Sequence, residues 1–347
     1  MEKNDILEYW KFQQPPEPGK LFTDPLFPPN MNSLLGLDSK GQPIDQLVYN
    51  EKSKARDDFK DITFVRPNEI FGENYKLFSG KIEFDDIKQG GLGDCYFLST
   101  VANLCKVSGL ITNLFKTKEK NKDGFYEIIF MIDGKPQIVI VDDFIPVRLS
   151  RSNKPKCCFA KPHENEIWVI LLEKAWAKIN GGYLNIIAGK SREVFEVLTG
   201  FGSITFNILN LDFEKKKLIQ KEIENAYETN AFLSCTTIKE ERLRKEGLVP
   251  CHSYSMLSVN KIELYNHDIV TLFRLRNPWS FKEWNGDWSE ESDKWDDYTK
   301  KQIDFKKKDD GSFFISDKDF YSLFSNLEIC YVLYDSTSLM YTIEEKN

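Results

Sequence analysis

The sequence predicts an α+β fold in two parts, and three observations lead to this prediction. Helical apolar spacing dominates the first half, alternating strand patterns dominate the second half, and the two do not alternate as βαβ units would. The 347 residues are enough for about two domains. We expect an extended arm over 1–60, a first subdomain over 61–200, a second over 201–335 and a tail over 336–347, with a cleft between the subdomains.

The elements of the first half follow from local patterns. Repeated prolines before residue 30 favour an extended arm. Apolar residues recur at helical spacing directly after Gly93 and Asp94, which predicts a buried helix that begins at or beside Cys95. Two apolar runs, over 125–133 and 136–144, predict a β-hairpin with its turn at Gly134 and Lys135.

A strongly apolar helix is predicted over 166–180, ending at two glycines. The segment GFGS after Thr199 is typical of a hinge, and an amphipathic helix is expected over about 213–227. Strand patterns then occupy 231–237, 252–264, 268–276, 311–316 and 328–334.

Composition narrows the classes of function. The chain carries 54 acidic and 47 basic residues, a net charge of −7, which argues against a nucleic-acid binder because phosphate contacts need clustered Lys and Arg. No apolar run is long enough to span a bilayer, so no intrinsic membrane segment is expected. The seven cysteines have no regular spacing, and the N-terminus has no signal-peptide pattern. Both observations indicate that the thiols are reduced and that the protein is cytoplasmic.

Four residues point to nucleophilic chemistry. Cys95 opens a predicted helix behind a glycine-rich turn, where the helix dipole favours the thiolate. Gln89 and a backbone N–H of that turn could form an oxyanion hole. His252 begins a predicted strand and Asn277 follows another, which suits a Cys–His–Asn set of the papain-like type. Each residue alone is also compatible with a structural role, but the combination favours catalysis.

Five blocks resemble the protease core of the calpain family, in the family's order: QGGLGDCYFLSTVANL, NEIWVILLEKAWAKINGGY, EGLVPCHSYSMLSV, RNPWSFKEWNGDWSE and DGSFFISDKDFYSLFSNLEIC. The resemblance runs from Phe22 to about Leu333. It implies a papain-like, calcium-dependent intracellular cysteine endopeptidase that makes limited cuts in protein substrates. Its two subdomains would assemble the active site when calcium is bound.

The resemblance assigns roles to residues of this chain. Cys95 matches the nucleophile, His252 the general base and acid, Asn277 the residue that orients the imidazole, and Gln89 the oxyanion-hole glutamine. Trp279 matches a tryptophan that fills the cleft in inactive calpains and moves aside on activation.

Two calcium sites are also implied. Asp86 and Glu173, with carbonyls near Ser79 and Lys81, align with the first site. Glu283, Glu290 and Asp310, with the carbonyl of Lys308, align with the second. Oxygen donors of this kind are the ligands that calcium prefers.

The chain departs from the family pattern at positions that bear on activity. Ser312 replaces an acid of the second calcium site, Glu290 replaces an Asp, and Phe84 replaces the Arg that bridges to the missing acid, so calcium is expected to couple more weakly to closure. Val194 and Cys251 replace two glycines of the substrate cleft and are expected to narrow it. These changes leave open a catalytically silent module that binds calcium or protein partners. A transglutaminase-like acyl transferase is a further alternative.

Overall fold

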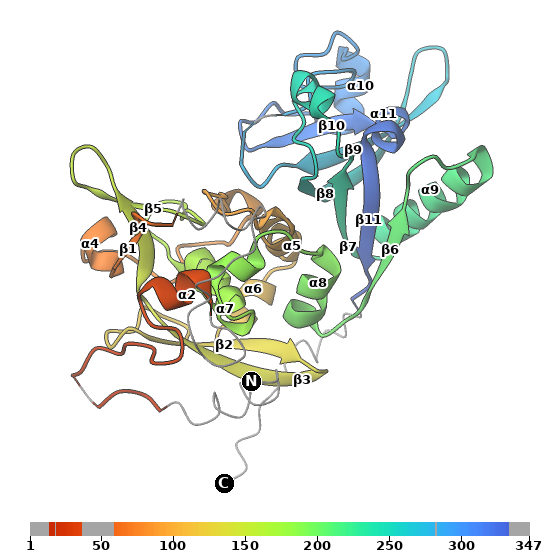
Figure 1. The fold of residues 1–347 in the computed structure, drawn as a ribbon. Helices are drawn as coiled ribbons and strands as arrows, with labels where there is room; N and C mark the ends of the chain where they lie inside the picture. Colours follow the sequence, from red (N-terminus) through yellow and green to blue (C-terminus); the bar gives the residue numbers. More distant parts are fainter. Residues whose placement is uncertain (1–13, 18, 37–58, 282, 333–347) are drawn as a thin grey trace. The chain divides into compact units, whose positions relative to one another are not determined.

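The protein divides into two compact units in a computed structural model, which describes residues 14–17, 19–36, 59–281 and 283–332 (Figure 1). Of the described residues, the first unit contains those up to Asp94 and Val107–Gly189, and the second contains Cys95–Lys106 and those from Lys190 to Val332. Most of the expected arm over 1–60 and all of the expected tail over 336–347 lie outside the described residues.

The first unit combines short helices with two small antiparallel sheets. Strands β2 (Phe125–Ile132) and β3 (Lys135–Asp142) form a hairpin, which appears in yellow in Figure 1. Strands β1 (Thr63–Val65), β4 (Ile145–Leu149) and β5 (Pro155–Cys157) form the other sheet in the order β1-β4-β5. The remaining elements are α2 (Met31–Leu35), α4 (Pro67–Phe71), η1 (Phe84–Asp86), α6 (Leu110–Leu114), α7 (Trp168–Ile179) and η2 (Tyr183–Ile186).

Helix α7 is the centre of the first unit. Every side chain from Trp168 to Lys178 is buried, as expected for a helix whose residues are mostly apolar. Its two buried lysines are paired: Lys174 with Asp142, and Lys178 with Asp24 at 2.7 Å. Buried charges must be paired in this way, because an isolated ion in the protein interior is costly.

The second unit is a six-stranded antiparallel sheet with helices. Its strand order is β10-β9-β8-β7-β11-β6. The strands are β6 (Ser203–Asn207), β7 (Phe232–Thr237), β8 (Ser253–Glu263), β9 (Ile269–Arg276), β10 (Ser312–Ser316) and β11 (Phe324–Cys330). The helices are α5 (Cys95–Leu104), α8 (Ser191–Thr199), α9 (Phe213–Glu228), η3 (Glu241–Glu246), α10 (Asp297–Gln302) and α11 (Asp317–Leu323).

Helix α5 is fastened to this sheet by polar as well as apolar contacts. Asn103 donates from Nδ2 to the carbonyl of Leu233 at 2.9 Å, and Ser255 donates from Oγ to the carbonyl of Ser99 at 2.9 Å. All of α5 except Cys95 is buried. The helix that begins with Cys95 is therefore held on strands β7 and β8.

The α+β class, the hairpin, the apolar helix and the helix beginning at Cys95 are confirmed. Three details differ from the sequence-based prediction. The segment after the expected hinge forms an edge strand, β6, and β11 begins at Phe324 instead of residue 328. Helices α5 and α8 group with the second unit, although they precede residue 200, because their apolar faces pack on its strands.

Candidate active site

His252 and Asn277 meet at one end of the large sheet. His252 lies directly before β8 and Asn277 directly after β9, and these strands are antiparallel neighbours with Ser255 opposite Arg276. The His252 ring nitrogen Nε2 lies 2.8 Å from Oδ1 of Asn277. The pairing of the two strands thus produces the contact between residues that are 25 positions apart.

Hydrogen bonds around Asn277 determine the tautomer of the imidazole. The Asn277 amide nitrogen Nδ2 donates to the carbonyl of Phe281 at 2.9 Å, and Oδ1 accepts the backbone N–H of Trp279 at 3.0 Å. Oδ1 is therefore an acceptor, and Nε2 of His252 must be the donor. In the neutral ring this leaves Nδ1 without a proton and able to accept one.

The imidazole is held neutral by burial. His252 is only 3% exposed, and desolvation lowers its pKa to about 4, although the bond to Asn277 acts in the opposite direction. The ring of Trp279 lies 4.9 Å from the His252 ring, and that of Tyr254 lies 5.1 Å from it. These aromatic neighbours exclude water, so at neutral pH His252 can act as a base.

Cys95 is the first residue of α5 and is half-buried, without a disulfide. Burial raises the pKa of the Tyr254 hydroxyl, and the Cys95 thiol contributes to this rise. Tyr254 is therefore a neighbour of both Cys95 and His252. The structure brings the predicted nucleophile, base and orienting residue into one unit.

The glycine-rich turn before Cys95 is tightly packed within the first unit. A Cβ on Gly90 would lie 1.9 Å from the carbonyl oxygen of Phe159, and Gly91 donates its N–H to the carbonyl of Cys158 at 2.7 Å. Gln89 is 6% exposed and donates from Nε2 to the carbonyl of Leu92 at 2.6 Å. Its role at the oxyanion stays a prediction.

The two replaced cleft glycines have different surroundings. Val194 is completely buried in α8. Its place in the substrate cleft stays a prediction. Cys251 is exposed and has a φ of 50°, in the left-handed region. A glycine suits this position because of the backbone conformation as well as the space in front of it.

The first predicted calcium site contains a different glutamate from the expected one. Asp86 accepts the N–H of Glu83 at 2.7 Å, and Ser79 donates its N–H to Oε2 of Glu166 at 2.8 Å. Burial raises the pKa of Glu166 to about 7, and the charge of Asp86 adds to this rise. Glu166, the second residue of the second family block, is thus the carboxylate near Asp86 and Ser79.

Glu173 has other partners, which corrects its assignment as a calcium ligand. It is 1% exposed, both of its carboxylate oxygens accept the N–H of Ala160, and its side chain contacts Asp94. Glu166 lies before α7, where it forms a parallel bridge with Lys76, whereas Glu173 lies within α7. Sequence position alone could not tell which of them faces Asp86.

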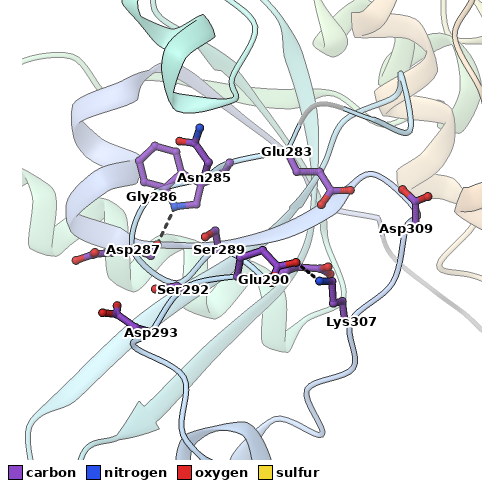
Figure 2. A pocket seen from close by; sticks show the side chains of 12 residues that line it. Glu283, Asn285, Gly286, Asp287, Ser289, Glu290, Ser292, Asp293, Lys307 and Asp309 are labelled. Carbon is purple, nitrogen blue, oxygen red and sulfur yellow. Dashed lines mark hydrogen bonds and ion pairs between the residues drawn. The ribbon is translucent and has the colours of Figure 1, made fainter.

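Acidic side chains gather at the second predicted calcium site. Figure 2 shows Glu283, Glu290 and Asp309 around a pocket of about 800 Å³. Burial raises the pKa of Glu283 to about 7, and the charges of Glu290, Asp310 and Asp309 add to this rise. Lys308 donates its backbone N–H to Oε1 of Glu290 at 3.2 Å.

Arg274 partly neutralises this acidic group. Its guanidinium lies 3.4 Å from Oδ2 of Asp310 and donates to Oγ of Ser312 at 2.7 Å. In the described residues, no three His, Cys, Asp or Glu side chains converge closely enough to hold a metal ion as they stand. The carboxylate and carbonyl oxygens of this group are of the kind that calcium prefers, but they would have to move closer to one another to coordinate an ion.

A model of the calpain family of cysteine proteases matches residues 22–331 of the chain. The chain belongs to this family. It is 34% identical over 322 residues to calpain clp-4 of Caenorhabditis elegans, which covers 89% of this chain and 41% of that protein. It is 32% identical to calpain-8 of Rattus norvegicus, over 92% of this chain and 44% of that protein.

A plant relative shows the same core in a much larger protein. The calpain-type cysteine protease DEK1 of Arabidopsis thaliana is 32% identical over 90% of this chain, which corresponds to 14% of that protein. The chain spans less than half the length of each of these relatives. None of the helices in the described residues has the length and apolar character that a membrane crossing requires.

Proposed function

We propose that this calpain-family core is an active, calcium-dependent cysteine endopeptidase that makes limited cuts in intracellular proteins. The single observation that supports catalysis most strongly is the 2.8 Å contact between Nε2 of His252 and Oδ1 of Asn277, in the unit that also carries Cys95. This contact leaves Nδ1 of His252 free of a proton and able to accept one, which a base needs and a purely structural histidine does not. An intracellular site of action agrees with seven cysteines that form no disulfide.

The proposed chemistry follows the acyl-enzyme route. Nδ1 of His252 takes the thiol proton as Sγ of Cys95 attacks the scissile carbonyl, so that a C–S bond forms and the carbonyl oxygen becomes an oxyanion. Gln89 and a backbone N–H would stabilise that charge. The imidazolium then gives its proton to the leaving amine as the C–N bond breaks, and water hydrolyses the thioester.

Trp279 is proposed to control the basicity of His252. Its indole covers the imidazole, and desolvation is the largest cause of the low His252 pKa. Displacement of the indole would hydrate the ring and raise its pKa toward the range in which it exchanges protons efficiently. This agrees with the resemblance, which implies that the tryptophan moves on activation.

Calcium is proposed to bind at both acidic groups. Asp86 and Glu166, with carbonyls of Ser79 and Lys81, would hold the ion in the first unit. Glu283, Glu290 and Asp310, with the carbonyl of Lys308, would hold it in the second. The raised pKa values of Glu166 and Glu283 support this assignment, because carboxylates that repel each other gain from a shared cation. The ion would supply positive charge that draws these loops together.

The deciding experiment is cleavage of unfolded casein at zero and millimolar calcium, beside a Cys95→Ala control. We expect cleavage only with calcium and only with Cys95 present. Cleavage without calcium would support the proposed protease activity and contradict its dependence on calcium. If neither condition gave cleavage, the chain would be a silent binding module, which the strained Cys251 in front of His252 would favour.

A further inference from the structure

The chain after β9 forms a tight turn around the side-chain amide of Asn277. Ser280 donates its N–H to the carbonyl of Asn277 at 2.9 Å, which closes a β-turn. The amide of Asn277 also binds the two aromatic residues of this segment: Oδ1 accepts the N–H of Trp279 at 3.0 Å, and Nδ2 donates to the carbonyl of Phe281 at 2.9 Å. The turn therefore brings Trp279 and Phe281 close together, although they are not adjacent in the sequence.

Two ring contacts connect Phe281 to the proposed base. The ring centroids of Phe281 and Trp279 lie 5.7 Å apart, and their planes are inclined at 30°. The ring centroids of Trp279 and His252 lie 4.9 Å apart, at 56°. Both separations are in the range over which aromatic rings attract each other. The three rings thus form a series of contacts that ends at the imidazole.

Exposure to solvent increases along this series of rings. His252 is 3% exposed, Trp279 is half-buried and Phe281 is 55% exposed. A phenylalanine that leaves more than half of its surface in water contributes less to folding than a core residue does, because hydrophobic stabilisation follows the buried area. Its ring packs on the indole, so its main effect is expected on the position of Trp279.

We propose that Phe281 is a positioning residue that holds the Trp279 indole against the His252 imidazole and so sets how readily water reaches the base. The inference rests on the proposed function, because it concerns release of the tryptophan in the proposed protease. Phe281 acts through Trp279 and takes no part in the chemistry itself. Desolvation is the largest cause of the low His252 pKa, which agrees with a ring that the indole covers.

The charges around the imidazole do not depend on Phe281. The ring of Tyr254 lies 5.1 Å from that of His252, and burial raises the pKa of its hydroxyl, which therefore stays protonated. The thiol of Cys95 adds to this rise. Arg276, beside the turn, donates to a serine hydroxyl and to a backbone carbonyl. Because a substitution of Phe281 changes no charge, a change in the His252 pKa would report hydration of the ring.

The expected effect follows from the strength of an aromatic pair. Such a pair shifts an equilibrium by roughly twofold to tenfold, so loss of the Phe281 ring should increase the fraction of displaced indole by that factor. A hydrated imidazole binds a proton more readily than a covered one. The apparent pKa of His252 should therefore rise with the displaced fraction, by up to about one pH unit for a tenfold increase.

Phe281→Ala is the decisive variant. It removes the ring but keeps the backbone carbonyl that accepts from Nδ2 of Asn277, so the bond that orients the base is retained. Phe281→Tyr keeps an aromatic ring and should behave as wild type does. The matched control is Phe213→Ala, which removes a ring that is 76% exposed at the start of α9 in the same unit.

NMR titration of the imidazole measures this effect without any need for proteolysis. The chain has three histidines, so the His252 signal is identified by its absence from His252→Gln. We expect Phe281→Ala to raise the His252 pKa by about 0.3 to 1 pH unit, and Phe281→Tyr and Phe213→Ala to match wild type. In a Trp279→Ala background, Phe281→Ala should have no further effect, because the residue acts through the indole.

Casein cleavage at limiting calcium is the second measurement. Because the displaced indole belongs to the proposed active state, Phe281→Ala should raise the cleavage rate by roughly twofold to tenfold when calcium is limiting. At saturating calcium the indole is already displaced, so kcat should equal that of wild type. A lower rate under both conditions would indicate general damage to the site and would overturn the proposal.

The NMR results can also overturn the proposal, independently of the proposed function. The same His252 pKa in Phe281→Ala and in wild type would show that Phe281 does not hold the indole in place. An equal rise in the wild-type and Trp279→Ala backgrounds would show that Phe281 does not act through Trp279. Absence of casein cleavage by wild type, together with the expected pKa changes, would reject only the protease activity and would leave the positioning role supported.

Discussion

Replacement of Cys251 by glycine should stabilise the protein. Cys251 has a φ of 50°, and for a residue with a Cβ the left-handed region costs roughly 1–2 kcal/mol. The turn is held in this conformation from both sides, since Cys251 donates its N–H to the carbonyl of Ile238 at 3.2 Å and His252 donates its N–H to Oγ1 of Thr237 at 3.0 Å. The glycine variant should therefore keep the turn and lose the strain.

The net gain in the free energy of unfolding is smaller than the strain energy that the glycine relieves. Glycine increases the conformational entropy of the unfolded chain, which costs about 0.4–1 kcal/mol. Cys251 is exposed, so removal of its side chain loses little buried apolar area. The difference leaves an expected increase of about 0.5–1 kcal/mol in the free energy of unfolding.

Urea denaturation measures this change through the midpoint at an unchanged slope. Cys251→Ala is the matched control, because it removes the thiol but keeps the Cβ, and it should not stabilise. If Cys251→Gly were no more stable than Cys251→Ala, the left-handed backbone would not be a source of strain and the reasoning would fail.

Four further outcomes follow from the site. Asn277→Ala should lower kcat for casein by about tenfold to a hundredfold with little change in KM, because the loss of a buried hydrogen-bond partner costs about 1–3 kcal/mol; an unchanged kcat would contradict the orienting role. Burial lowers the His252 pKa from 6.5 to about 4, so the stabilisation by the neutral ring is present above about pH 6.5 and is lost as the pH falls toward 4. The difference in stability between wild type and His252→Gln should shrink over that range, and NMR titration of the ring should give the low pKa directly. Trp279→Ala should raise that NMR pKa toward the ordinary value, and an unchanged value would mean that the indole does not control hydration of the ring. Glu283→Gln should raise the melting temperature without calcium above pH about 7, where the carboxylate repels its acidic neighbours, and should reduce the increase in melting temperature that calcium produces.

Local sequence patterns were sufficient to predict many helices and strands of this protein. The apolar spacing after Asp94 predicted the helix Cys95–Leu104, and the two apolar runs predicted the hairpin β2–β3. These elements depend on periodicity and turn residues, which are properties of short segments. The order of Cys95, His252 and Asn277, together with five family blocks, was sufficient to identify the family.

Side-chain direction was decided by the tertiary structure. Glu166 and Glu173 lie in one family block, but Glu166 lies before α7 and accepts the N–H of Ser79, whereas Glu173 lies within α7 and accepts the N–H of Ala160. Val194 is completely buried in α8, and this burial depends on what packs against that face of the helix. Such choices depend on neighbours that are distant in the sequence.

The sequence by itself determined the types of element, their order and the chemistry that the reactive residues can perform. Only the tertiary structure decided that the helix beginning at Cys95 packs on strands β7 and β8, that Cys251 is in a left-handed conformation, and that Asp94 is completely buried. The physical reason is that burial and charge pairing are properties of assembled surfaces. A carboxyl group has its ordinary pKa in the unfolded chain, and that pKa rises only when folding removes water from the group.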